Sequence, residues 1–126
     1  MNEAINQLTE QITGAAIAVH NGLGPGLLES ANQNAPAHEF RLRGVAFEEQ
    51  KLGAVSCKDR SIEGAYRLDF LAEKLVVVAL KAIDELRRVH VAQMLTYLRF
   101  SACRIGLLFN FRTTLLTKPG LRSLVL

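Results

Sequence analysis

The segment that most constrains the fold of this 126-residue chain is LVVVAL, at residues 75–80. All six residues are apolar and three are consecutive valines, a β-branched type that favours strands. A strand with one face in water alternates apolar and polar side chains, whereas this segment has no polar position. It therefore predicts a central strand buried on both faces, with a packed layer on each side of its sheet. Lys81 follows at once, and an ammonium group there is costly unless an anion lies nearby.

Two helical patterns precede this strand. Apolar residues at spacings of three and four predict a helix over 5–19, and the glycine-rich segment 21–26 ends it. A second helical pattern runs from residue 27 to about Arg43, with Gly44 as its stop. Pro36 lies inside this second pattern and predicts a kink or a restart there, with Asn34 available as a cap.

The remaining segments predict a sheet with one helical crossover. Strand patterns cover 45–56 and 61–71, separated by the polar turn CKDR, and Glu73 and Lys74 make a tight return into the central strand. A helical pattern at 89–100, an apolar strand at 104–111 and the terminal RSLVL, readable as a short edge strand, follow. The order predicts one α/β domain over 1–126. Its sheet is mixed: an antiparallel meander precedes a helical crossover into a parallel neighbour.

Charge and composition narrow the class of protein. Residues 1–73 carry six Lys/Arg and ten Asp/Glu, whereas residues 74–126 carry nine Lys/Arg and two Asp/Glu. The basic half is suited to a polyanion such as nucleic acid, although on charge alone a solvated surface is the simpler interpretation. No apolar run approaches the roughly 20 residues of a membrane span, and the polar N-terminus is unlike a signal peptide. With two dispersed cysteines, we expect a cytoplasmic protein with reduced thiols.

Five polar residues form a candidate site. Asp69 lies on the strand expected to pair with the strand that carries Lys81, so their side chains can converge near one sheet edge. Glu29 lies in the first turn of the second helix, where the helix dipole favours a carboxylate. Gln93 and Tyr97 are four residues apart and therefore share a helix face. Carboxylates that hold Mg²⁺ beside a lysine that positions water or phosphate can hydrolyse a phosphodiester.

In this order the motifs resemble the small bacterial family of GxxExxY proteins, part of the PD-(D/E)XK nuclease superfamily. The resemblance extends nearly from end to end and rests on the segments GAAIAVHNGLGPGLLES, EGAYRLDFL, VVVALKAI, HVAQMLTYLR and GLLFNF. It implies a restriction-endonuclease-like α/β core and hydrolysis of nucleic acid, most naturally DNA, with Mg²⁺ or Mn²⁺.

The resemblance also implies a role for each matching residue. Asp69 matches the first metal-binding aspartate, and Lys81 matches the catalytic lysine of the E-x-K half-motif, within which Leu80 offers its backbone carbonyl to the metal. Glu29 matches the glutamate of G-x-x-E, with a metal-binding or catalytic role. Gln93 and Tyr97 match the Q-x-x-x-Y pattern of the catalytic site.

Three positions depart from the family pattern. The E-x-K glutamate is replaced by Ala79, the expected tyrosine of G-x-x-E-x-x-Y by Asn32, and Pro36 interrupts the helix that carries that motif. Residues 79 and 81 face the same side of a strand, so a glutamate at 79 would stand beside Lys81 and opposite Asp69. The missing carboxylate predicts impaired or lost hydrolysis and leaves open whether this chain binds the metal ion.

Two functions and several simpler roles stay open. The chain is either a weakened metal-dependent nuclease or an inactive nuclease fold kept for binding nucleic acid or a protein partner, and a homo-oligomer is open in both cases. Alternatively, Lys81 merely pairs with Asp69 at a strand end, Glu29 is an ordinary charge at a helix start, and Gln93 and Tyr97 are surface and packing residues.

Overall fold

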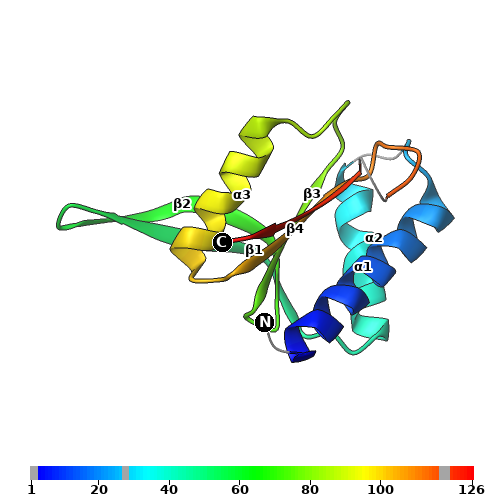
Figure 1. Ribbon diagram of the computed structural model, residues 1–126, viewed down its shortest axis with the longest axis horizontal. Helices are drawn as coiled ribbons and strands as arrows, with labels where there is room; N and C mark the ends of the chain where they lie inside the picture. Colours follow the sequence, from blue (N-terminus) through cyan, green and yellow to red (C-terminus); the bar gives the residue numbers. More distant parts are fainter. Residues whose placement is uncertain (1–2, 27–28, 117–119) are drawn as a thin grey trace.

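The fold places one sheet between two layers of helices. The structure, a computed structural model, describes residues 3–26, 29–116 and 120–126. Its elements in chain order are α1 (Glu3–Leu23), α2 (Glu29–Leu42), β1 (Phe47–Cys57), β2 (Arg60–Ala72), β3 (Val76–Lys81), α3 (Arg88–Ser101), β4 (Ile105–Asn110) and β5 (Leu121–Val125). Helices α1 and α2 cover one face of the sheet and α3 covers the other (Figure 1). Within the described residues, no helix is long and apolar enough to cross a membrane.

The sheet confirms the predicted topology. Its strand order is β1-β2-β3-β4-β5, so the apolar segment lies in the middle strand. Strands β1, β2 and β3 form an antiparallel meander, α3 crosses over, β4 runs parallel to β3, and β5 pairs antiparallel to β4 at the sheet edge. Because β3 and β4 are parallel, Lys81 at the end of β3 is paired with Asn110 at the end of β4.

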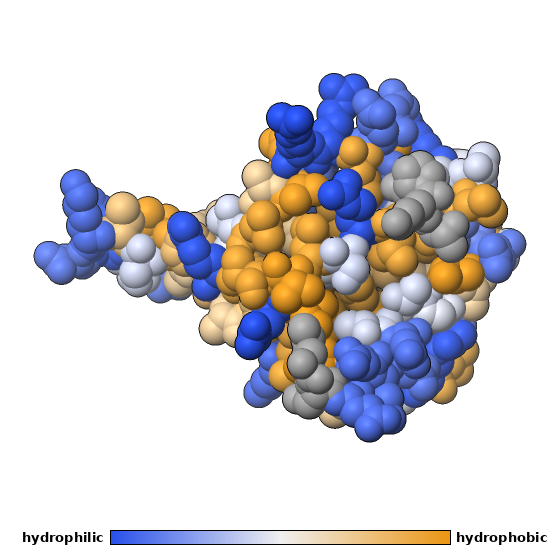
Figure 2. Space-filling model, in the orientation of Figure 1, coloured by the Kyte–Doolittle hydropathy of each residue, from blue (hydrophilic) through white to orange (hydrophobic). Residues whose placement is uncertain are grey.

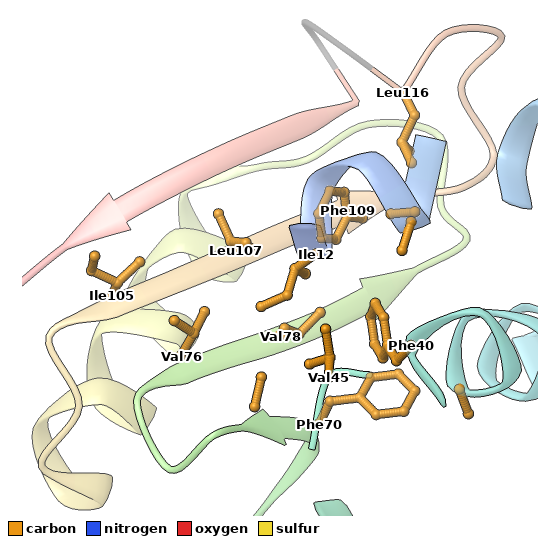
Figure 3. Packing of buried hydrophobic residues seen from close by; sticks show 14 of the residues in the cluster. Ile12, Phe40, Val45, Phe70, Val76, Val78, Ile105, Leu107, Phe109 and Leu116 are labelled. Carbon is orange, nitrogen blue, oxygen red and sulfur yellow. The ribbon is translucent and has the colours of Figure 1, made fainter. Parts of the chain in front are cut away.

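Strand β3 separates two hydrophobic clusters. Val76 and Val78 belong to the cluster that contains residues of α1 and α2, which Figure 3 shows packed against the sheet. Val77 and Ala79 belong to the cluster that contains residues of α3. Successive side chains of a strand point to opposite faces, which explains why no polar residue interrupts the segment. Each fully buried valine stabilises the fold by about 1.5–3 kcal/mol.

Helix α2 corrects one prediction. It runs unbroken from Glu29 to Leu42, so Pro36 causes neither a restart nor a new cap, and Asn34 lies in the helix interior. Pro36 is itself buried, and Ala37 and Phe40 after it are 2% and 0% exposed, so core packing at the proline and after it holds the helix together. Tertiary packing of this kind routinely outweighs a local propensity. The predicted first residues, 27 and 28, lie outside the described part of the chain.

The end of α2 confirms the predicted glycine stop. Gly44 has a φ of 75°, a left-handed conformation that glycine adopts without a steric penalty. The Gly44 amide donates to the Arg41 carbonyl over 3.1 Å, and the Val45 amide donates to the Phe40 carbonyl over 2.9 Å. This pair of bonds is a Schellman motif, which satisfies the last carbonyls of the helix and directs the chain into β1.

The strands β1 and β2 are much longer than the rest of the sheet. They have 11 and 13 residues, whereas β3 and β4 have six each. Pairing of β2 with β3 covers only residues 70–72 of β2, but pairing of β2 with β1 continues to Arg60. The surplus forms a two-stranded ribbon that projects from the body of the molecule (Figure 1). We call residues 50–67 of this ribbon the β-arm.

Candidate active site

Asp69 lies where β2 and β3 separate. The last pair between these strands is Phe70 with Val78, and Asp69 is the next residue on β2. Its carboxylate oxygen Oδ2 accepts a hydrogen bond from the Leu80 amide over 2.8 Å, so the side chain supplies the partner that the ladder no longer provides. Such a bond to an ionised acceptor is stronger than a neutral one and fixes the carboxylate against β3.

The backbone of Leu80 faces this carboxylate. The Phe111 amide donates to the Lys81 carbonyl over 2.8 Å, so the polar groups of residue 81 point toward β4. The N–H and C=O of neighbouring residues on a strand point to opposite sides. The carbonyl of Leu80 is therefore directed away from β4, to the side on which Asp69 lies.

Lys81 and Gln93 connect the end of β3 to α3. The Lys81 ammonium donates to the Gln93 side-chain oxygen Oε1 over 3.3 Å. Lys81 is half-buried and Gln93 is exposed, so this bond lies at the mouth of the site. The amide oxygen satisfies one of the three ammonium donors and leaves others available for an anion.

Tyr97 lies next to these groups on α3. Burial raises the pKa of its phenol above the ordinary value, and the negative charge of Asp69 raises that pKa further, whereas Arg67 and a hydrogen bond with Gln93 lower it. Its ring stacks on Tyr66 of β2, with centroids 5.4 Å apart and an interplanar angle of 22°. The phenol therefore keeps its proton at neutral pH and is positioned by both neighbours.

A cavity of about 450 Å³ brings the predicted residues together. Its lining comes from the β-arm, β2, β3 and α3: Leu52, Gly64, Tyr66, Arg67, Asp69, Val77, Val78, Ala79, Lys81, Gln93 and Tyr97. Four of the predicted site residues thus share one cavity with Ala79, the residue that replaces the expected glutamate. Glu29 is the first residue of α2, but its side chain lies outside the described part of the structure, as does that of Asn32.

With this geometry in place, comparison with known proteins identifies the family. A family model described as the PD-(D/E)XK nuclease superfamily matches residues 6–123. The chain belongs to the PD-(D/E)XK nuclease superfamily. Neither the comparison with curated proteins nor that with solved structures gave a match. Superfamily membership confirms the broader part of the resemblance and makes nucleic acid the expected substrate class, whereas the narrower GxxExxY assignment stays a prediction.

Nucleases of this superfamily generally use divalent metal ions, but the described side chains do not complete a site for one. Across residues 3–26, 29–116 and 120–126, no group of three or more His, Cys, Asp or Glu is placed to hold a metal. Asp69 is the one carboxylate in the described cavity lining, and Ala79 contributes no oxygen. Mg²⁺ is usually held by one or two protein carboxylates, with waters and phosphate oxygens completing its octahedron. Of that protein contribution, the described side chains of the cavity supply Asp69 alone.

Sequence reasoning missed two residues that contact the predicted ones. Arg67 lines the cavity and is two positions before Asp69 on β2, so the period of a strand could have drawn attention to it. Gln33 of α2 donates through Nε2 to the Asp69 carbonyl over 3.4 Å and to the Glu49 carboxylate over 3.3 Å. No local signal in the sequence predicts the contact between Gln33 and Asp69, because it joins α2 to β2 across the fold.

Asn110 was also missed, and it fixes the chain just after Lys81. It is fully buried at the end of β4. Its Oδ1 accepts from the Ile83 amide over 3.1 Å and from the Arg112 amide over 3.2 Å, and its Nδ2 donates to the Ile83 carbonyl over 2.8 Å. Asn110 is thus a positioning residue for the segment that leaves the site. The signal for it was a single polar residue inside the apolar run GLLFNF.

Proposed function

We propose that this chain binds nucleic acid at the cavity between β3 and α3 and that its capacity to hydrolyse a phosphodiester is impaired. The observation that carries the proposal is the shared cavity lining of Asp69, Ala79 and Lys81. It supports a nuclease-type site at the position expected for the superfamily, in which the position of one carboxylate is occupied by a methyl group.

Binding is supported by the charges that line the cavity. Lys81 and Arg67 contribute two cations, and Asp69 is the one described anion. A phosphate that enters the cavity can receive charge-assisted hydrogen bonds from the ammonium and the guanidinium groups. The stacked pair Tyr66 and Tyr97 lines the same cavity as these cations, and aromatic side chains beside basic groups are typical of nucleic-acid sites.

Impaired hydrolysis is supported by the composition of the site. Ala79 and Lys81 line the same cavity, so a glutamate at 79 would bring a second carboxylate toward Asp69. Without that carboxylate, fewer protein oxygens are available to hold a metal ion that would stabilise the negative charge developing on a reacting phosphate. Each ~1.4 kcal/mol of lost transition-state stabilisation slows a reaction tenfold, so loss of one ligand is enough to reduce the rate by orders of magnitude.

A binding measurement tests the first half of the proposal. Fluorescence anisotropy with a short labelled DNA duplex should show binding at low salt that weakens steeply as salt rises. Lys81→Gln should weaken this binding about tenfold, whereas Lys74→Gln, at the opposite end of β3, should leave it unchanged. Negligible binding by the wild type at low salt would contradict the proposal.

A cleavage measurement tests the second half. Plasmid and single-stranded DNA are incubated with the protein in Mg²⁺ or Mn²⁺, with Asp69→Asn as the control. We expect the wild type to cleave at a rate close to that of the Asp69→Asn variant. Rapid cleavage by the wild type that the Asp69→Asn substitution abolishes would show that the site is a fully competent nuclease.

A further inference from the structure

The β-arm is an extended ribbon with no core of its own. From the opposed pair Gly53 and Tyr66 it continues through the pair Cys57 and Arg60, and nearly all side chains of residues 50–65 are exposed. Leu52 and Ile62 are 64% and 47% exposed. Figure 2 shows the ribbon standing clear of the body, with hydrophilic residues at its tip and hydrophobic ones along its length. A two-stranded ribbon is marginally stable alone, so a surface that covers it would stabilise it.

The charge of the β-arm favours a polyanion as that surface. Residues 50–67 carry four cations against two anions: Lys51, Lys58, Arg60 and Arg67 against Asp59 and Glu63. Lys58 and Arg60 lie at the exposed tip, where they can reach phosphates that lie far from the cavity. The tip also carries Asp59 and Glu63, so the positive excess comes from Lys51 and Arg67 at the base of the arm. Lys51 pairs with Glu48 over 2.8 Å, whereas Arg67 lines the cavity, where its charge is complementary to nucleic acid.

The β-arm is continuous with the candidate active site. Leu52, Gly64, Tyr66 and Arg67 of the arm also line the cavity that holds Asp69 and Lys81. A nucleic acid whose phosphodiester is held in the cavity therefore extends along the arm. From Gly53 the ribbon continues four residues along β1 to Cys57, which at about 3.3 Å per residue gives a reach of roughly 13 Å before its turn, more than the ~8.5 Å depth of the major groove.

We propose that the β-arm lies in the major groove of double-stranded DNA while the cavity holds one of its phosphodiesters. The inference rests on the proposed nucleic-acid binding and names its substrate class. The major groove of B-form DNA is about 12 Å wide and admits a two-stranded ribbon, whereas the major groove of double-stranded RNA is deep and too narrow. Single-stranded DNA offers no groove. Duplex DNA is therefore the preferred ligand.

Shortening the arm tests this assignment. Residues 54–65 are replaced by an Asn-Gly turn, which joins Gly53 to Tyr66 in the register in which they already oppose each other. The variant keeps Leu52, Tyr66 and Arg67 and loses only Gly64 from the cavity lining. We expect its affinity for duplex DNA to fall at least tenfold while its weaker affinity for single-stranded DNA changes less than twofold. The slope of log K against log salt on the duplex should fall by about 2, because two phosphate contacts are lost.

A full-length pair of variants separates charge from folding. Lys58→Glu with Arg60→Glu reverses the charges at the tip, and Lys74→Glu with Arg104→Glu makes the same change at the opposite end of the sheet, where both residues are exposed. The tip variant should lose at least tenfold in affinity for duplex DNA. The control variant should lower the affinities for duplex DNA and for single-stranded DNA by the same factor, within about twofold.

The outcomes are distinct for this inference and for the proposed function. Equal affinity of the wild type for duplex DNA and duplex RNA, or unchanged duplex binding by the shortened arm, overturns the inference but leaves cavity binding intact if Lys81→Gln still weakens it. A concentration-dependent dimer in sedimentation velocity that the shortened arm abolishes would assign the arm to a second copy instead. Absence of any binding by the wild type contradicts both proposals.

Discussion

At the scale of single residues, Ala79 carries the sharpest prediction. Ala79→Glu places a carboxylate on the cavity side of β3, beside Lys81 and toward Asp69. We expect this variant to gain Mg²⁺- or Mn²⁺-dependent cleavage of plasmid DNA at least tenfold above the wild type, because it restores a missing oxygen ligand.

The control for this gain is Ala79→Gln, which matches glutamate in shape but lacks its charge. It should remain at the wild-type rate. Ala79 is only 6% exposed, so far-UV circular dichroism of both variants must match the wild type before rates are compared. A folded glutamate variant without cleavage would show that the site lacks more than this one group.

The phenol of Tyr97 provides a second prediction at this scale. Its pKa is raised by burial and then by the charge of Asp69, so Asp69→Asn should lower that pKa toward the ordinary value of 10.0. The chain has two tyrosines, and absorbance titration near 295 nm with Tyr97→Phe assigns the signal. Because the folded-state pKa is raised, the contribution to stability is complete below pH 10 and declines as pH rises through the folded-state pKa. An unchanged titration curve in Asp69→Asn would mean that the charge of Asp69 does not influence the pKa of Tyr97.

How far the site could be predicted depends on the kind of contact that each residue makes. Gln93 and Tyr97 follow from helical spacing, and Asp69 and Lys81 from their places on adjacent strands, so local rules sufficed to bring them together. Gln33 contacts Asp69 only because α2 packs against β2, and no spacing along the chain encodes that approach. The remaining predicted group, the Glu29 side chain, lies outside the described residues.

At the scale of elements, the β-arm depends on one glycine beneath one tyrosine. A Cβ atom added at Gly53 would overlap the ring of Tyr66, the residue opposite it on β2. Gly53→Ala should therefore displace that ring, disrupt its stacking on Tyr97 and destabilise the fold by about 1–3 kcal/mol. Urea unfolding and the near-UV circular dichroism of the tyrosines measure both effects.

A double-mutant cycle isolates the cause. In the background of Tyr66→Ala the ring is absent, so adding Gly53→Ala should cost less than about 0.5 kcal/mol. Equal costs in both backgrounds would instead mean that glycine is required by the backbone of the β-arm rather than by the tyrosine.

The elements themselves were predictable where one local rule dominated. The spacing of apolar residues indicated α3, and Gly44 indicated the end of α2, because each is fixed by short-range geometry. Pro36 misled because its effect on an isolated helix is unfavourable, whereas in the protein the burial of Ala37 and Phe40 outweighs it. The projection of the β-arm was not predicted, because the lengths of β1 and β2 do not reveal that β3 pairs with only the last residues of β2.

At the scale of the whole molecule, the topology followed from the apolar run at β3. A strand with no polar face requires cover on both sides, and the order of the flanking patterns left a meander and one crossover as the simplest arrangement. What remained hidden was the relation of the surplus ribbon to the cavity. That relation is set by the twist and register of the sheet, which no single segment specifies.

The same strand predicts how the molecule unfolds. Val78 packs with α1 and α2, and Val77 packs with α3, so Val78→Ala and Val77→Ala each remove two methyl groups from a different layer. Each should lower the free energy of unfolding by about 2 kcal/mol. Both tyrosines lie in the α3 layer, so their fluorescence reports that layer, whereas far-UV circular dichroism reports all helices and strands. If residues 1–126 form one cooperative domain, Val78→Ala shifts the urea midpoint equally by both probes. A shift seen by circular dichroism alone would mean that the two layers unfold independently, with β3 failing to couple them.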